Sequence, residues 1–358
     1  MRPGNSTSLN LVYTIGVEVE LVLYVIQAVL AVYFILRLKN ISLMHVNLRV
    51  ILCNVPMIYL IFTPVRLYFI IEYLITYFTN GKLENSSFER CLVIRFFYDM
   101  AINVLAFTIP MLALERAIAT LKSGRYETCE KPWLGFGIVA GMYCIGFAYS
   151  LVFVWYDYTH NYDAYSRMPS CHLMFTNPGV MFYLAVACCV GFGVAMTLLY
   201  GLYLFNLMKQ KQHGRQNLAA RYQYAENVAT LRVLVPTVTG YLVSLVISMT
   251  LISLHYFQKE YLASSDWIFE QVDDSHGFLE EGGTFQVFNL NIVVFVLYFM
   301  IMHLALYSPL RKQVSKDYER LFWRRRRTHE TNPSSFVQQY DHEKTTNTYF
   351  KQLESVWN

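Results

Sequence analysis

Several charged residues interrupt segments of this chain that are otherwise apolar, and their types and spacing could do chemistry. They are Glu18, Glu20, Arg66, Arg95 and Asp99. Arg95 and Asp99 lie four residues apart and Asn103 follows four residues later, so the three side chains share one helix face. A charge in an apolar segment is costly unless it is paired or hydrated, and it usually has a function. Two interpretations stay open: Arg66, Arg95, Asp99 and Asn103 line a pocket for a small polar or anionic ligand, or they are interfacial residues and one structural ion pair.

A second charged site stands at the end of the third apolar segment, where Glu115 directly precedes Arg116. An acid beside an arginine at this depth can hold the arginine until activation frees it to face a cytoplasmic partner. The alternative is simply a helix that leaves the membrane at this point. Two residues alone do not decide between these interpretations.

The elements that must position these residues are membrane helices. The chain has 358 residues, of which 55% are hydrophobic and 15% charged, and its mean hydropathy is +0.32. Four stretches hold no Asp, Glu, Lys or Arg over 24, 41, 26 and 29 residues: 133–156, 168–208, 233–258 and 282–310. Each exceeds the roughly 20 residues that a helix needs to cross the hydrocarbon layer.

Three shorter apolar stretches precede these four, at 21–36, 50–65 and 100–114. We therefore predict an all-α membrane protein, a seven-transmembrane helix bundle, because lipid requires backbone hydrogen bonds to close within each segment. The predicted spans are 13–36, 47–71, 92–114, 133–156, 178–208, 233–257 and 284–307. The corresponding regions are an extracellular N-terminus (1–12), a receptor-like bundle (13–309), a basic amphipathic juxtamembrane helix (310–327) and a disordered cytoplasmic tail (328–358).

The distribution of positive charge predicts the orientation. If the N-terminus is outside, the inner segments hold 22 of the 29 Lys and Arg residues and the outer segments hold five. Cytoplasmic loops carry such an excess, so the N-terminus is predicted to be outside. The sequons at Asn5 and Asn85 then face outward and are predicted glycosylation sites, whereas the one at Asn40 faces inward.

Cysteine positions agree with this topology. Of the seven cysteines only Cys91 and Cys171 fall on the oxidising outer side, so we predict a disulfide between them, with two free thiols as the alternative. After the seventh span, apolar residues recur at helical spacing among basic ones. This pattern predicts a helix on the inner leaflet that contacts anionic membrane lipids. A partner site at Arg324–Arg327 is the alternative.

Enzyme signatures are missing from the sequence. There is no His-Glu-x-x-His, no Walker loop and no Gly-x-Ser-x-Gly. We predict that the protein is not an enzyme, and we expect no cofactor, no metal site and no nucleic-acid partner.

Three short motifs occur in a characteristic order: His45-Val-Asn47-Leu48, Glu115-Arg116-Ala-Ile-Ala119-Thr120 continuing to Tyr126-Glu127, and Arg221-Tyr222-Gln223-Tyr-Ala-Glu226-Asn227. Over residues 10–325 the chain resembles the nematode serpentine chemoreceptors of the Sra superfamily. Class epsilon (Sre) is the favoured class, and classes ab and b stay open.

This resemblance implies a G-protein-coupled chemosensory receptor in the plasma membrane of sensory cilia, with a small-molecule chemical ligand outside and a heterotrimeric G protein inside. It implies a G-protein face at Glu115, Arg116, Arg221 and Glu226. Arg116 takes the place of the arginine in the Asp/Glu-Arg-Tyr motif of rhodopsin-like receptors, although Ala117 stands where tyrosine would be. The alternatives are a ligand-gated ion channel of seven-helix type, against which the charge bias argues, and a small-molecule transporter.

Overall fold

The computed structural model describes residues 5–41, 44–78, 88–122, 126, 132–160, 178–211, 218–264 and 274–327. Eight helices are assigned in these ranges: α1 (Asn5–Lys39), α2 (Val46–Phe78), α3 (Phe88–Leu121), α5 (Trp133–His160), α7 (Pro178–Lys211), α8 (Leu218–Ser264), α9 (Asp274–Leu306) and α10 (Ser308–Arg327). None of the described residues is in a strand. The chain divides into two units, residues 1–313 with the seven long helices and residues 314–358, whose described part continues α10.

Each of the seven long helices contains a segment long and apolar enough to cross a membrane. These segments are 15–39, 46–71, 91–121, 133–160, 186–211, 223–254 and 286–306. The predicted all-helical seven-span fold is therefore confirmed. The helices expose rows of large apolar residues, such as Val22, Val25 and Val29 on α1, as a surface in contact with lipid tails requires.

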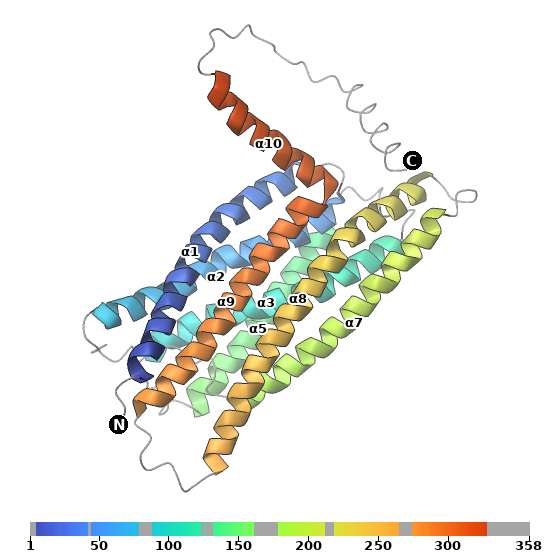
Figure 1. Cartoon of the computed structure of the whole chain (residues 1–358). Helices are drawn as coiled ribbons and strands as arrows, with labels where there is room; N and C mark the ends of the chain where they lie inside the picture. Colours follow the sequence, from blue (N-terminus) through green and yellow to red (C-terminus); the bar gives the residue numbers. More distant parts are fainter. Residues whose placement is uncertain are drawn as a thin grey trace. The chain divides into compact units, whose positions relative to one another are not determined.

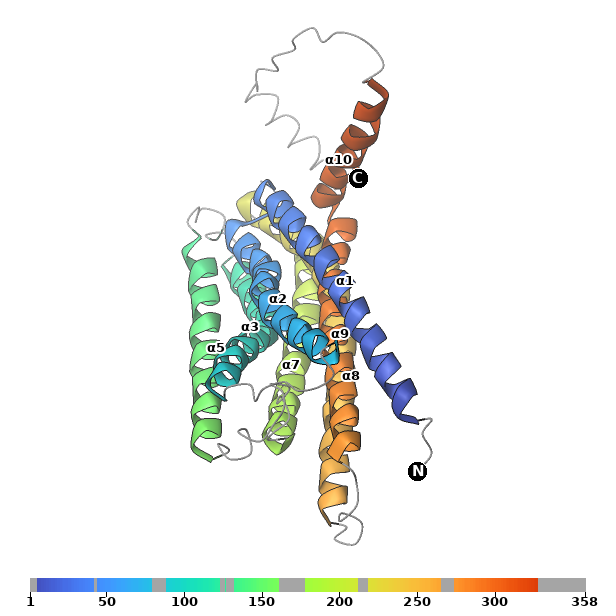
Figure 2. The same ribbon diagram turned by 90° about the vertical axis from the view of Figure 1, so that its left-hand side faces the viewer.

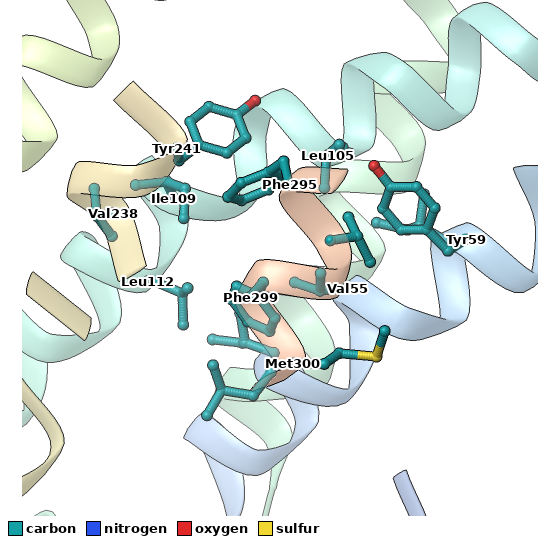
Figure 3. Close-up of a cluster of buried hydrophobic side chains, with 14 of the residues drawn as sticks. Val55, Tyr59, Leu105, Ile109, Leu112, Val238, Tyr241, Phe295, Phe299 and Met300 are labelled. Carbon is teal, nitrogen blue, oxygen red and sulfur yellow. The ribbon is translucent and has the colours of Figure 1, made fainter. Parts of the chain in front are cut away.

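Within this unit α3 is the central helix, because it packs against α2, α5, α7 and α8 (Figures 1 and 2). α1 packs on α2 and α9, and α8 packs on α7 and α9. The core between them is a continuous cluster of buried aliphatic and aromatic side chains. Figure 3 shows part of it, with Val55 and Tyr59 from α2, Ile109 and Leu112 from α3, and Phe299 from α9 around one centre.

α8 and α9 approach each other closely. The ring of Tyr298 lies where a Cβ on Gly240 would be, so only glycine permits this contact. The Tyr298 hydroxyl donates to the Pro236 carbonyl oxygen at 2.9 Å, and the Asn291 amide donates to the Ser244 carbonyl oxygen at 2.8 Å. These polar links fix the register of the two helices.

Several helices extend beyond the predicted spans, and two of these extensions concern the inner ends of α3 and α8. α3 was expected to end at residue 114 but continues to Leu121, and α8 begins at Leu218, well before the expected residue 233. The prediction used charge to mark where an apolar helix ends. Here Glu115 and Arg116 are fully buried against each other, so the helix continues past them.

Candidate functional site

The three sequence motifs meet in one buried polar network. It lies at the end of the bundle where α1, α3 and α7 end and α2, α5 and α8 begin, which we call the basic end because the charge distribution predicts it to be cytoplasmic. The helices alternate in direction, so the end of α3 and the starts of α2 and α8 come together there. Residues from α2, α3, α7 and α8 contribute to the network.

The centre of the network is the ion pair between Glu115 and Arg116, both with 0% of the side chain exposed. Arg116 Nε donates to Glu115 Oε2 at 2.6 Å, and Arg116 Nη2 donates to Glu115 Oε1 at 2.6 Å. Two parallel bonds of this kind are the strongest geometry for an arginine and a carboxylate. Both partners of this ion pair therefore belong to α3.

Asn227 on α8 connects this pair to the neighbouring helices. Its Oδ1 accepts from Arg116 Nη1 at 2.9 Å and from Gln223 at 3.2 Å. Its Nδ2 donates to Thr120 Oγ1 and to Asn206 Oδ1 on α7, both at 3.2 Å. Asn227 therefore uses its full hydrogen-bonding capacity, and its neutral side chain joins α8 to α3 and α7.

Tyr126 connects the pair to α2 and α5. Its hydroxyl donates to Glu115 Oε1 and accepts from Asn47 Nδ2 at 3.2 Å. Asn47 Oδ1 in turn accepts from the backbone N–H of Gly135 at 3.0 Å. Burial raises the pKa of Tyr126, and the Glu115 carboxylate raises it further, so the phenol stays protonated and can donate.

Gly135 is required where α5 begins. A Cβ at this position would lie 2.8 Å from the backbone oxygen of Asn47, closer than real Cβ atoms approach backbone atoms.

His45 contributes two contacts to the same side of the network. Its ring packs on Tyr126 with 4.1 Å between centroids, and its backbone N–H donates to Glu226 Oε1 at 2.7 Å. Arg221, the fourth residue of the predicted G-protein face, is half-buried in the first turn of α8.

The charged residues Glu20, Arg66, Arg95 and Asp99 lie in the opposite half of the bundle. Arg66 on α2 is 1% exposed and donates from Nε and Nη2 to Glu20 Oε1 on α1, at 3.1 and 2.9 Å. Gln286 on α9 donates to the other oxygen of Glu20 at 2.6 Å. Arg66 therefore lies in a buried ion pair that links three helices.

Arg95 and Asp99 form the ion pair that their spacing suggested, with 3.3 Å between Arg95 Nε and Asp99 Oδ2. Both side chains are buried, and Asn103 is buried one turn further along α3. Next to Asp99, the Tyr98 hydroxyl donates to Asn289 Oδ1 on α9 at 2.8 Å. Whether these residues also contact a ligand stays a prediction.

A cavity of about 110 Å³ lies between α3, α7, α8 and α9. Its wall includes Leu105, Cys188, Tyr241, Ser248 and Phe295. The four residues predicted to line a ligand pocket, Arg66, Arg95, Asp99 and Asn103, are not part of this wall. These charged residues therefore do not line the described cavity.

Other predicted residues are described only in part. Cys91 forms a disulfide, but Cys171, its predicted partner, lies outside the described residues, as does the sequon at Asn85. The backbone of Asn5 is described as the first residue of α1, and its side chain is not.

Comparison of the sequence with known proteins places the chain in a family. The sequence model of the serpentine type 7TM GPCR receptor class ab chemoreceptors matches residues 4–271. The chain belongs to this family. Like the other serpentine chemoreceptors of class ab it is a multi-pass membrane protein, with seven membrane helices.

A relative within the same class is serpentine receptor class alpha/beta-14 of Caenorhabditis elegans. It is 30% identical over 227 residues, which are 60% of this chain and 55% of the relative, so the aligned part spans about half of the relative's length. These matches support the predicted membership of the nematode serpentine chemoreceptors. They correct the favoured class from epsilon to ab.

Several residues of the class ab bundle were missed by sequence analysis. Asn206 and Gln286 are buried and join the networks described above, and Glu20 was noted without its partner. Each of the two amides is isolated in an apolar segment, and this could have indicated a contact between helices, because buried amides in membrane helices usually form hydrogen bonds across helices. The apolar cavity left no comparable signal in the sequence.

Proposed function

We propose that this protein is a G-protein-coupled chemosensory receptor that detects a small external chemical cue. Membership of the class ab chemoreceptor family supports a receptor with this general role. The single observation that carries the proposal is the buried Glu115–Arg116 pair, which lies within α3 and hydrogen-bonds to α8 through the neutral amide of Asn227. Such an arrangement can be opened without separating the two charges.

The mechanism follows from this arrangement. A ligand bound in the outer part of the bundle shifts the balance between two forms only if it binds one form more tightly. In the inactive form Asn227 holds α8 against Arg116. In the active form α8 moves away at the basic end, and Arg116, Arg221 and Glu226 become accessible to a heterotrimeric G protein.

The remaining predicted features fit a receptor of the plasma membrane. A disulfide from Cys91 to Cys171 would hold the second outer loop over the bundle, and glycans on Asn5 and Asn85 would mark the outer side. The exposed basic side chains of α10, such as Arg311, Lys316 and Arg320, suit contact with anionic lipid headgroups. Sensory cilia are the location that the family resemblance suggests.

The proposal is tested in cells that express the chain with a promiscuous Gα subunit and a calcium reporter, screened with small soluble and volatile compounds. Arg116→Ala should abolish the response at equal surface expression, because it removes the residue that the active form exposes. Arg232→Ala is the matched control, since Arg232 is an exposed arginine on α8, and should leave the response unchanged.

Two results would contradict the proposal. A ligand-evoked current that persists in cells without heterotrimeric G proteins would favour the channel. A normal G-protein response from a well-expressed Arg116→Ala variant would show that the network at the basic end does not control coupling.

A further inference from the structure

The cavity between α3, α7, α8 and α9 has an apolar wall. Leu105 on α3 and Phe295 on α9 face α8 at the level of Tyr241 (Figure 3), and Met249 and Ile252 on α8 extend the wall. No charged side chain is among the described residues that line it. Transfer of an ion from water into such a wall costs several kcal/mol or more, so a charged occupant is strongly disfavoured.

Three hydroxyl groups line the wall, those of Tyr241, Ser244 and Ser248, and none of them donates a hydrogen bond to a described residue. Ser248 Oγ accepts a hydrogen bond from Asn291 Nδ2 at 2.9 Å, which orients the hydroxyl. Within the described part of the chain no acceptor takes the Ser248 hydroxyl proton. The Tyr241 hydroxyl makes no hydrogen bond to any described residue either, and in Figure 3 it points away from Phe299 and Met300.

The Tyr241 ring itself is held firmly. It stacks on Phe192 of α7 with 4.4 Å between centroids, and it meets Phe295 of α9 edge to face, also at 4.4 Å. The hydroxyls of Tyr241 and Ser248 are therefore fixed in place before any ligand arrives, which lowers the entropy lost on binding. Each can donate to an acceptor atom inside the cavity.

The size of the cavity limits its occupant. Its volume of about 110 Å³ is of the same order as the engineered apolar cavity of ~150 Å³ that binds benzene. A compact molecule about the size of benzene, with roughly six or seven non-hydrogen atoms, would fit by the same comparison.

We propose that this cavity binds a compact, uncharged, mainly apolar molecule with one hydrogen-bond acceptor, such as a cyclic ketone, and that Ser248 and Tyr241 donate to that acceptor. This inference names the chemical class of the cue, and it therefore rests on the proposed receptor function. It replaces the polar or anionic ligand expected from Arg66, Arg95 and Asp99. The charged residues then serve the structure, and the cavity selects the ligand.

The test uses the purified full-length chain in lipid nanodiscs and cyclohexanone as the probe, with binding measured by saturation-transfer NMR. We expect saturable binding of cyclohexanone and none of cyclohexanecarboxylate, which has a similar shape but carries a charge. Ala106→Phe, which fills the cavity from α3, should weaken binding at least tenfold. Ala148→Phe makes the same change at an exposed position on α5 and should leave binding unchanged.

The hydroxyl donor is tested separately. Ser248→Ala should weaken cyclohexanone binding about threefold to tenfold, as expected for the loss of one hydrogen bond, and should not weaken methylcyclohexane binding. Thr250→Val removes a hydroxyl from the exposed face of the same helix and should have no effect on either probe.

Equal binding of cyclohexanone to wild type and Ala106→Phe would overturn the cavity assignment, because it would indicate partition into lipid. Equal binding of the ketone and the carboxylate would overturn the ligand class. Neither assay contains a G protein, so these failures are distinct from a failure of the receptor proposal in the calcium assay.

Discussion

Among the described residues of the bundle two arginines are fully buried, and they are held in opposite ways. Arg66 pairs with Glu20 from another helix, 46 residues away along the chain. Arg116 pairs with its immediate neighbour Glu115 on the same helix and hydrogen-bonds to α8 through the neutral amide of Asn227, while the Glu226 carboxylate of α8 acts on it electrostatically. Both guanidinium groups satisfy a carboxylate, but only one ion pair joins two helices.

This difference decides which helices can separate. To move α1 away from α2 near Arg66, two buried charges must part, which typically costs several kcal/mol. To move α8 away from α3 near Arg116, the hydrogen bonds to Asn227 must break and the attraction of the Glu226 carboxylate must weaken, but no directly bonded ion pair between described residues of the two helices has to part. The broken hydrogen bonds can be replaced by bonds to water or to a partner. The Glu20–Arg66 pair is thus a fixed link between α1 and α2, whereas α8 can separate from α3 more easily at the basic end.

The largest effect should follow from breaking the fixed link. Arg66→Met leaves the Glu20 carboxylate buried beside Gln286 alone, and we expect it to lower the free energy of unfolding by about 3–5 kcal/mol. The double variant Glu20→Leu/Arg66→Met removes both charges and should recover most of this loss. Equilibrium unfolding in detergent micelles measures both.

Arg232→Met is the control for this prediction, because Arg232 is exposed and its loss should change stability by about 0.5 kcal/mol or less. If Arg66→Met costs no more than Arg232→Met, the pair does not hold α1 to α2, and the contrast between the two arginines fails.

A smaller loss of stability, with a change in signalling, should follow at the basic end. Asn227→Leu removes the acceptor of Arg116 on α8 but leaves the ion pair intact, so we expect a loss of roughly 1.5–3 kcal/mol. Because the closed form loses this link, basal G-protein signalling should rise in the calcium assay. Asn289→Leu removes a buried amide from the opposite half and should lower stability without raising basal signalling. A basal rise in both variants would mean that loosening the bundle anywhere activates it.

The smallest effect concerns the contact between α5 and α2. Gly135→Ala places a Cβ against the Asn47 backbone and should cost about 1–2 kcal/mol, within the usual range for overpacking. Gly137→Ala, two residues along the same helix, meets no atom within 4 Å among the described residues and should leave thermal stability unchanged or slightly raised. Equal melting temperatures for the two variants would show that α5 shifts freely at its start.

The seven helices were predictable from the sequence because lipid leaves the backbone no other way to satisfy its hydrogen bonds. The Arg95–Asp99 pair was also predictable, since a spacing of four residues places two side chains on one helix face whatever surrounds them. Local spacing and apolar length are properties of a single segment, so they can be read from the sequence without knowing how the helices pack.

Contacts between helices were not predictable in this way. Nothing in the spacing of Glu20, Arg66 and Gln286 along the chain shows that the three meet, because the register between helices is set by packing over their whole length. The family resemblance implied one inner face with Glu115, Arg116, Arg221 and Glu226, but it did not predict the contacts of His45 and Asn227 there. The apolar cavity arises from side-chain shape and has no signature in residue order.

One side chain on the cavity wall gives the protein a built-in chemical reporter. Cys188 is a free, half-buried cysteine that borders the cavity from α7. A small membrane-permeable alkylating reagent can reach this thiol through the space where a ligand would lie, so an occupant of the cavity should slow the reaction. The fall in the rate of Cys188 alkylation on adding a ligand therefore reports occupancy of the cavity, in intact membranes and without a labelled ligand.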